Sequence, residues 1–294
     1  RGRLPQPVTV GESAAVGESA AVGDTADEDL AFAIALAARA GEVLMDRYER
    51  LEQIDYKSAR DVVTEADHQS EALILDAIRA RSPGDAILAE ETGEHGAVRG
   101  EAPTSGRARV WIVDPLDGTV NYANGIPFFC VSIGLIVDGA PTVGVIHDPT
   151  RGETFAATLD GPALLSGSLG EGSHGVECSD KERLSDFVIS MALNGRAVAT
   201  RSRSVRGAIR IPRSMGSAAL ALAYVANGRF DAFIQEGGLS AWDVAAAGLI
   251  AERSGALVTS MRGGPWFDLS HSPKSIGILA APPAHHGELL RLAS

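Results

Sequence analysis

The chain of 294 residues is long enough for a large core and two subdomains, and its 45% hydrophobic and 22% charged residues are typical of a globular protein. A formal net charge of −12 argues against non-specific nucleic-acid binding, which requires a basic surface, so we expect no nucleic-acid partner. The two unclustered cysteines, Cys130 and Cys178, exclude a disulfide framework, and no apolar run approaches the ~18 residues of a membrane span. We therefore expect a cytoplasmic protein with no membrane partner.

The N-terminal segment contains two copies of a six-residue unit between positions 10 and 21 and is rich in Gly, Ala, Ser and Glu. Such a segment offers little apolar surface to offset the entropy of ordering, which predicts a disordered tail over residues 1–24. Thr25 and Glu28 form a capping-box pattern, so a helix is expected from Thr25 to about Tyr48.

Two acidic segments follow this helix. Residues 61–67 lead into a second helix with an apolar stripe, and Asp67 at its start is either a helix cap or a site residue. Residues 86–93 form a short apolar strand pattern that ends in the paired Glu90 and Glu91 and a glycine turn.

The most informative segment is an apolar strand pattern at 110–113 that ends in a proline turn. Asp114 and Asp117 lie three positions apart on this turn, next to the Leu116 carbonyl and the Thr119 hydroxyl. These oxygen groups converge on one small volume, and hard divalent cations such as Mg²⁺ prefer an all-oxygen set of ligands. The alternative is a strand-ending turn with solvated aspartates.

The next segments predict an antiparallel sheet. Strand patterns at 128–137 and 142–147 flank the Asp-Gly dipeptide at 138–139, which is a hairpin signal, and 153–159 adds a third strand. Helices followed by this meander indicate a sheet under two helices, and we assign residues 25–180 to an N-terminal α+β subdomain that carries the metal site.

The C-terminal half, residues 181–294, is expected to form an α/β subdomain that completes the site. Its predicted elements are strands near 187–191, 231–235 and 276–280 and helices at 217–227 and 242–254. This alternation indicates a second sheet of mixed direction. Asp243, in the first turn of its helix, is either an N-cap or a site residue.

Taken in order, three motifs resemble the inositol monophosphatase family, within the wider Mg²⁺-dependent, lithium-sensitive phosphatases. They are LAEETG at 88–93, WIVDPLDGTVNY at 111–122 and AWDVAAAGLIAERSGALVT at 241–259, and the resemblance covers most of residues 27–290. It implies an α+β fold, the layered αβαβα sandwich that the family shares with fructose-1,6-bisphosphatase. It also implies a homodimer that uses two or three Mg²⁺ ions per site and is inhibited by lithium.

The resemblance assigns roles to the acidic motifs. It implies metal ligation by Glu90, Asp114, Leu116 (through its carbonyl), Asp117 and Asp243. Glu90 and Thr119 would position and deprotonate a metal-bound water, and Asp67 would hydrogen-bond Thr119 or bind a further metal.

The resemblance also assigns the contacts with a small phosphorylated polyol or sugar. They fall on Asp117, Gly118, Thr119, Gly216, Ser217, Ala218, Glu236, Asp243 and Lys57. The residues before the 217–227 helix would offer free amides to an anion or a hydroxyl. Glu236, seven positions before Asp243, matches the family's hydroxyl-binding glutamate. A plain helix cap, a rim carboxylate and a surface lysine are the alternative interpretations of these segments.

Between 194 and 213 the chain departs from the family pattern and carries six arginines, which either contact a second phosphate or a partner subunit or form a solvated basic face. The function expected from the resemblance is hydrolysis of inositol 1-phosphate to inositol and phosphate by a metal-activated water. The alternatives are a fructose-1,6-bisphosphatase, a histidinol-phosphatase or a phosphoadenosine-phosphate phosphatase of the same superfamily. A catalytically silent regulatory or binding protein with the same fold is an alternative of another class.

Overall fold

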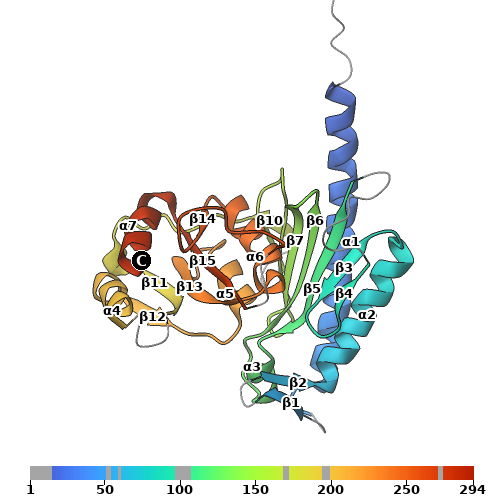
Figure 1. Ribbon diagram of the computed structural model, residues 1–294, viewed down its shortest axis with the longest axis horizontal. Coiled ribbons are helices and arrows are strands. Elements are labelled where there is room, and N and C mark those ends of the chain that lie inside the picture. Colours follow the sequence, from blue (N-terminus) through green and yellow to red (C-terminus); the bar gives the residue numbers. More distant parts are fainter. Residues whose placement is uncertain are drawn as a thin grey trace, which may run out of the picture.

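The computed structural model describes residues 15–50, 54–58, 61–96, 107–167, 172–193, 199–270 and 274–294, with the side chains of 15–24, 54–58 and 61–63 left out of that description. Helices and sheets alternate in five layers (Figure 1). A helix pair, an eight-stranded sheet, a second helix pair, a five-stranded sheet and a third helix pair follow one another across the molecule. The predicted α+β class and αβαβα sandwich are therefore confirmed.

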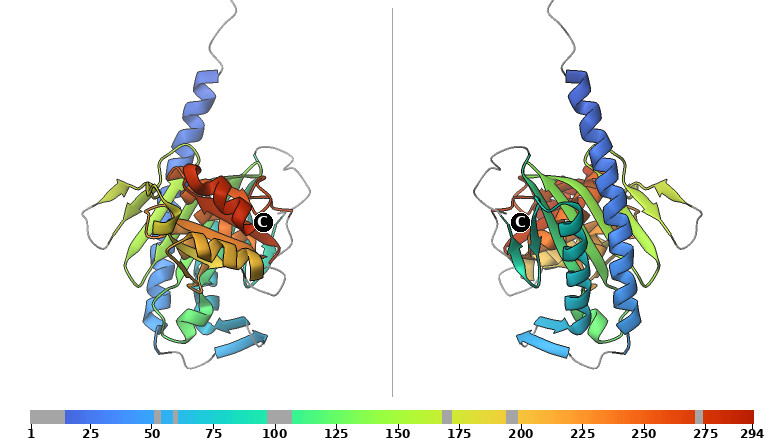
Figure 2. Two further views of the ribbon diagram at one scale, coloured as in Figure 1. Left: turned by 90° about the vertical axis from the view of Figure 1, so that its left-hand side faces the viewer. Right: turned by 90° about the vertical axis from the view of Figure 1, so that its right-hand side faces the viewer.

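The first layer consists of α1 (Ala15–Arg47) and α2 (Glu65–Arg81), which lie side by side on the outer face of the first sheet (Figure 2). Buried residues of α1 such as Leu36 and Leu44 join the same apolar cluster as Trp111 of the sheet. The predicted helix start and capping box at Thr25 are wrong, because α1 already begins at Ala15.

The first sheet has eight strands in the order β10-β9-β8-β7-β6-β5-β3-β4. In chain order these are β3 (Ala86–Ala89), β4 (Gly93–His95), β5 (Arg109–Asp117), β6 (Cys130–Val137), β7 (Ala140–Asp148), β8 (Glu153–Thr158), β9 (Leu164–Ser166) and β10 (Ser173–Gly175). All neighbours are antiparallel except β3 and β5, which are parallel. The predicted hairpin joins β6 to β7, and its turn residues Asp138 and Gly139 have φ of 51° and 85°. A separate hairpin is formed by β1 (Ile54–Ser58) and β2 (Asp61–Thr64).

The middle layer consists of α5 (Ala218–Ala223) and α6 (Ala241–Arg253), which contact both sheets. The small residues of α6 allow a close approach to β7: a Cβ on Gly144 would lie 2.6 Å from the Ala246 carbonyl oxygen. The predicted helix over 217–227 is too long. After Ala223 the chain tightens into turns in which the amides of Val225 and Ala226 bond carbonyls three positions earlier.

The second sheet has mixed strand directions, as predicted. Its order is β12 (Ile211–Arg213), β11 (Val188–Ala192), β13 (Ala232–Leu239), β15 (Ile276–Ala281) and β14 (Leu257–Ser260). The pairs that include β11 are parallel, and the pairs that include β15 are antiparallel. The outer layer is formed by α4 (Ala199–Ala208) and α7 (Pro283–Ala293), whose apolar side chains pack on this sheet.

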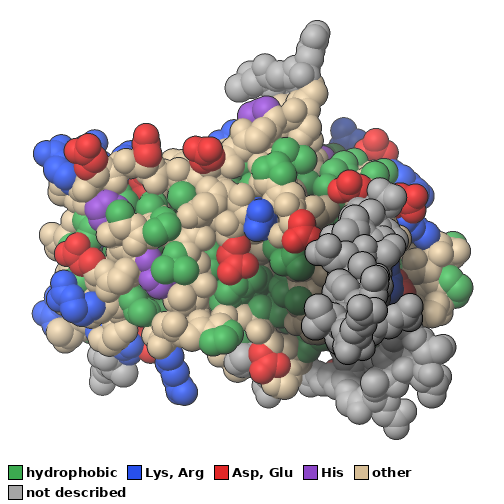
Figure 3. All heavy atoms as spheres, turned by 90° about the horizontal axis from the view of Figure 1, so that it is seen from above, with side chains coloured by type: hydrophobic (Ala, Val, Ile, Leu, Met, Phe, Trp, Pro, Cys, Tyr) green, Lys and Arg blue, Asp and Glu red, His purple; other side chains and the backbone are tan. Residues whose placement is uncertain are grey.

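Two short helical segments complete the described fold, α3 (Thr119–Ala123) and the 3₁₀ turn Leu184–Asp186. Among the described residues, none of the helices combines the length and the apolar character that crossing a membrane requires. On the face shown in Figure 3, acidic and basic side chains are interspersed with hydrophobic ones instead of gathering by sign.

Candidate metal centre

Asp114 and Asp117 lie at the end of β5, where its pairing with β6 is interrupted. The register slips between them, so that Asp114 pairs with Ser132 and Asp117 with Cys130. The amide of Leu116 donates to Asp114 Oδ1 at 3.0 Å, which closes the turn around the first carboxylate. The interruption brings both acidic side chains to one end of a buried strand.

Gly118 makes the bend after Asp117 possible. Its φ of 101° is in the left-handed region, and an added Cβ would lie 3.1 Å from the Phe128 carbonyl oxygen and 3.1 Å from Ser217 Cβ. A side chain at this position would therefore push the turn away from the helix that carries Ser217.

Asp243 reaches the same place from α6. Ser240 is the N-cap of this helix, and the Ser240 amide donates to Asp243 Oδ2 at 2.6 Å in a capping box. One carboxylate oxygen from each of Asp114, Asp117 and Asp243 lies within 4.8 Å of the other two. The cluster is therefore compact enough for one cation to touch all three side chains.

The electrostatics of this cluster favour a cation. Burial raises the pKa of Asp114 well above its usual value, and the nearby Glu90, Asp117 and Asp243 carboxylates raise it further. Burial and Asp117 likewise raise the pKa of Asp243, and the positive charge of Lys274 only partly opposes this. Buried acids that repel one another in this way are stabilised as carboxylates by a divalent cation, and the all-oxygen donor set fits a hard ion.

Glu90 lies next to these three aspartates, directly after β3. Its amide donates to the Val113 carbonyl at 3.1 Å, which fixes it beside the end of β5. Its side chain shares a hydrogen bond with Asp114. The structure thus brings together the four carboxylates to which the resemblance assigned metal ligation.

Asp67 and Thr119 form a second group next to the Leu116 carbonyl. Thr119 Oγ1 lies 3.3 Å from Asp67 Oδ1 and 3.1 Å from Leu116 O. The other Asp67 oxygen accepts from the Thr64 amide at 2.8 Å and from the Thr64 hydroxyl at 2.6 Å, so Asp67 also caps α2. Burial raises the pKa of Asp67 to about 6, although the hydrogen bonds from Thr64 oppose the shift.

The N-terminus of α5 contacts the aspartate cluster directly. Ser217, its N-cap, donates its hydroxyl to Asp117 Oδ2, and the Ala219 amide donates to the same oxygen at 2.7 Å. Gly216 precedes it with φ of 84°, and an added Cβ there would lie 2.7 Å from the Asn121 side chain. These contacts tie α5 to the turn after β5.

A cavity of about 290 Å³ opens beside the cluster. Of the residues assigned to substrate contact, it is lined by Asp117, Gly216, Ser217, Ala218 and Asp243. A larger cavity of about 880 Å³ lies elsewhere and includes Lys181, Arg253 and His285, but none of the three aspartates, so cavity size alone does not mark the site.

Sequence reasoning missed the wall that the second sheet supplies to this cavity. Ser190 to Ala192 of β11 and Phe233 and Gln235 of β13 line it. Ser190 to Ala192 form the carboxyl-terminal part of β11, and open α/β sheets bind ligands at the carboxyl ends of their parallel strands. Phe233 and Gln235 lie in the first half of β13, paired with those residues of β11. The rule could have identified the end of the strand predicted at 187–191. Lys274, whose charge acts on Asp243, carried no sequence signal.

Glu236 and Lys57 were also predicted to contact the substrate. Glu236 is not among the described residues that line the cavity beside the aspartate cluster. The Glu236 carboxylate forms an ion pair with Arg201 of α4, with Arg201 Nη2 2.9 Å from Glu236 Oε1. Lys57 lies in β1, but its side chain lies outside the described residues.

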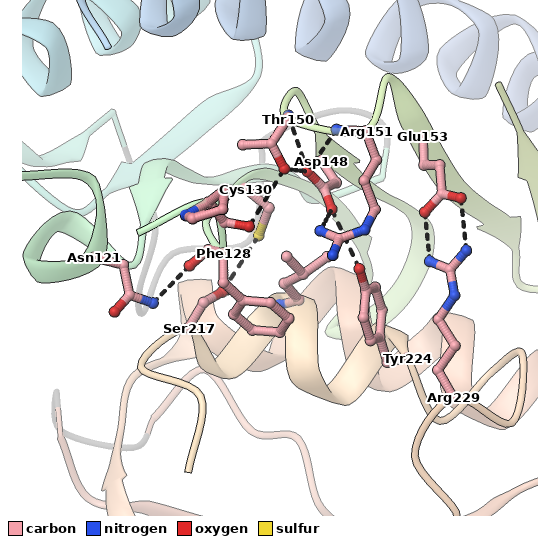
Figure 4. Close-up of polar contacts among 12 residues, drawn as sticks. Asn121, Phe128, Cys130, Asp148, Thr150, Arg151, Glu153, Ser217, Tyr224 and Arg229 are labelled. Atoms are coloured by element: carbon pink, nitrogen blue, oxygen red, sulfur yellow. Dashed lines mark hydrogen bonds and ion pairs between the residues drawn. The ribbon is translucent and has the colours of Figure 1, made fainter. Parts of the chain in front are cut away.

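Farther from the cluster, a buried polar network holds α5 against the first sheet (Figure 4). Asp148 at the end of β7 is fully buried, and its carboxylate accepts from Thr150, from Arg151 and from the Tyr224 hydroxyl at 3.3 Å. A second ion pair joins Glu153 of β8 to Arg229. The guanidinium groups of Arg151 and Arg229 both lie over the Tyr224 ring, 5.9 Å and 4.8 Å from its centroid.

Comparison with known proteins identifies the family. The sequence profile of the inositol monophosphatase family matches residues 25–294. A Nus factor SuhB from Salmonella typhimurium is 35% identical over 241 residues, which cover 80% of this chain and 86% of that protein. An inositol-1-monophosphatase from Synechocystis sp. is 36% identical over 258 residues, which cover 85% of this chain and 83% of that protein.

A solved structure agrees with the sequence comparisons. The extragenic suppressor protein suhB from Bartonella henselae matches with a TM-score of 0.79 and 31% identity, over 91% of this chain and 98% of that chain. The motifs, the layered fold and these relatives lead to one conclusion: the chain belongs to the inositol monophosphatase family.

Proposed function

We propose that this protein is a Mg²⁺-dependent hydrolase of phosphate monoesters and that its substrate is inositol 1-phosphate. The observation that carries the proposal is the convergence of two buried aspartates of β5 and the half-buried Asp243 of α6 beside a cavity of about 290 Å³. A phosphate monoester is a dianion, so its hydrolysis demands neutralisation of charge more than a protein nucleophile.

In this proposal Glu90, Asp114, Asp117, Asp243 and the Leu116 carbonyl hold the metal. Bound Mg²⁺ would supply positive charge that neutralises the phosphate and acidifies a water. We assign two or three ions to the site, since four carboxylates supply enough oxygen ligands.

The remaining chemistry belongs to the protein's own groups. The Thr119 hydroxyl, placed between Asp67 Oδ1 and Leu116 O, would orient the attacking water. Glu90 would accept the proton of that water, and Asp67, with its pKa raised to about 6, provides a further acceptor through Thr119. Gly216 to Ala218 would line the pocket around the organic part of the substrate.

The choice of inositol 1-phosphate rests on the family and on the residues after the metal motif. Asn121-Tyr122 and the Ile-Pro-Phe segment at 126–128 look more like the inositol and fructose-bisphosphate branches than the histidinol or phosphoadenosine ones. The Asn121 side chain joins the turn to the pocket, because it donates to the carbonyls of Phe128 and Met215.

The direct test is a phosphate-release screen, with and without Mg²⁺. Its substrates are inositol 1-phosphate, fructose 1,6-bisphosphate, histidinol phosphate and phosphoadenosine phosphate. We expect Mg²⁺-dependent turnover with the highest kcat/KM for inositol 1-phosphate. A higher value for another substrate would reassign the substrate within the superfamily.

The second candidate is a regulatory protein without catalysis, and one observation favours it: the relative from Salmonella typhimurium is named a Nus factor. The intact carboxylate cluster argues against it, since buried acids without a metal repel one another. Absence of turnover with every ester in the screen would favour the regulatory candidate.

A further inference from the structure

Glu236 lies on an irregular part of β13 beside the pocket. Gly237 and Gly238 have φ of 75° and 82°, and the pairing with β15 slips between Gln235 and Leu239. Gln235 and Gly238 both line the cavity next to the aspartate cluster. Because the regular strand pairing is interrupted here, the ladder alone does not fix the direction of the Glu236 carboxylate.

Arg201 of α4, in the outer helix layer, forms an ion pair with this carboxylate. Arg201 Nη2 lies 2.9 Å from Glu236 Oε1, and Arg201 Nη1 donates to the Ala293 carbonyl at 3.2 Å. The guanidinium is therefore held by the last residue of α7 while it holds Glu236. The two side chains are only 27% and 33% exposed, so the pair is partly shielded from solvent and salt.

The ion pair also changes the charge beside the pocket. A phosphorylated substrate is an anion, and the pocket already contains Asp117 and Asp243. Another unpaired carboxylate at its edge would repel the substrate, whereas a carboxylate paired with a guanidinium does not. The pair engages Oε1, and a carboxylate has a second oxygen that can accept a hydrogen bond from a hydroxyl.

We propose that Arg201 is a positioning residue for substrate selection, which orients Glu236 beside the pocket and neutralises its charge so that the carboxylate reads a hydroxyl of the substrate. This inference rests on the proposed function, because it requires a phosphorylated polyol in the pocket. The arginine-rich segment then contributes to selection through one of its members, the one directed at Glu236.

A double-mutant cycle tests whether Arg201 acts through Glu236. The variants are Arg201→Gln, Glu236→Gln and the combination of both. The quantity compared is kcat/KM for inositol 1-phosphate divided by kcat/KM for p-nitrophenyl phosphate, which has no hydroxyl beside its phosphate. We expect each single variant to lower this ratio about tenfold, as the loss of a charged hydrogen bond does, mainly through KM for inositol 1-phosphate. The combined variant should have the same ratio as Glu236→Gln alone.

Arg203→Gln is the matched control, because Arg203 is on the same helix, is exposed, and its Nε donates to the Ala199 carbonyl of that helix. It should leave the ratio unchanged. Since Arg201→Gln also removes the contact with Ala293, Arg201→Lys provides a second arm that keeps the charge. We expect Arg201→Lys to lower the ratio less than Arg201→Gln does, and to cause no further decrease when it is combined with Glu236→Gln. The melting temperature of each variant shows whether it folds.

The outcomes separate this inference from the proposed function. Additive losses in the combined variants, or an unchanged ratio in Arg201→Gln, would overturn the role of Arg201 while the phosphatase assignment stands. A wild-type protein that hydrolyses no phosphate ester in the presence of Mg²⁺ would overturn both.

Discussion

Asp67 and Asp243 each cap a helix and also lie in the candidate site. Each is the third residue of its helix, and in each case one oxygen, Oδ2, accepts the amide of the N-cap residue in a capping box. The other oxygen of Asp67 faces Thr119, and Asp243 also belongs to the aspartate cluster. A helix cap and a site residue were alternatives at the level of sequence, but a carboxylate has two oxygens and can be both.

The raised pKa values predict how Mg²⁺ and pH act together. Burial raises the pKa of Asp114, Asp117 and Asp243, so the folded protein holds these protons more tightly than the unfolded chain. Without metal, stability should fall as the pH rises above the ordinary carboxyl value of about 4, and for Asp67 this loss extends to pH of about 6. Mg²⁺ binds the deprotonated form, so its stabilising effect should grow over the same interval.

Melting temperatures measured with and without Mg²⁺ between pH 4 and pH 8 check this expectation. The gain from Mg²⁺ should increase with pH in the wild type and should shrink in Asp243→Asn, which removes one charge from the cluster. A gain that is the same at every pH would contradict the linkage between metal and carboxylate protons.

At the scale of elements, the position of α5 depends on contacts at both of its ends. Its N-terminus donates to Asp117, and the Tyr224 hydroxyl just after it contacts the buried Asp148 (Figure 4). Because Asp148 also accepts from Arg151 and from Thr150, its charge is fully engaged inside the fold. The network therefore fixes the helix whose first residues line the pocket.

Asp148→Asn should destabilise the protein by about 3 kcal/mol, since removing one member of a buried charged network leaves its partners unsatisfied. Asp76→Asn is the matched control: Asp76 is 83% exposed and lies 3.8 Å from Arg79, so its loss should change stability by less than ~0.5 kcal/mol. Urea unfolding measures both free energies. Equal stability of the two variants would contradict the role given to Asp148.

The elements that the sequence predicted well are those with strong local signals. The hairpin at 138–139 has turn residues that favour positive φ, and α6 starts at a capping box within one residue of its predicted position. The end of α5 was mispredicted because the backbone after Ala223 forms tight turns, in which the Tyr224 carbonyl accepts the amide of Phe230 instead of continuing the helix. The short edge strands β12 and β14 were not predicted at all, because only pairing with β11 and β15 defines them.

In the candidate site, too, residues in local motifs could be predicted and residues placed by tertiary structure could not. The resemblance to the family assigned Glu90, Asp114, Asp117 and Asp243 as ligands, because each lies in one of the three short motifs that carry it. Gln235 and Lys274 could not be identified in that way. Their position depends on how the second sheet meets the first, which no local pattern encodes.

At the scale of the whole molecule, the site exists only where two halves of the chain meet. Asp114 and Asp117 come from the eight-stranded sheet, whereas Asp243 and most of the cavity wall come from the second half. The large shared core between the sheets, which includes Phe128, Tyr224 and Ile250, holds the two halves together. The expected boundary between subdomains near residue 180 stays a prediction.

Residues 1–24 should be dispensable. The buried part of α1 begins with Asp29, Ala33 and Leu36, and the first turns of the helix extend beyond the two sheets (Figure 1). A protein that starts at Asp24 should keep its melting temperature and its turnover within error. A clear loss of either would show that the N-terminal segment docks on the fold or on another subunit.

The central claim is that the aspartate cluster binds Mg²⁺ and thereby drives hydrolysis. Its most direct test is phosphate release from inositol 1-phosphate across a Mg²⁺ titration, with wild-type protein and with Asp114→Asn, which keeps the volume of the side chain and removes its charge. We expect saturable activation of the wild type by Mg²⁺ and at least a ~10²-fold lower rate in the variant, given how much metal charge stabilises the transition state. Wild-type turnover in the presence of EDTA, or an undiminished rate in Asp114→Asn, would contradict the account.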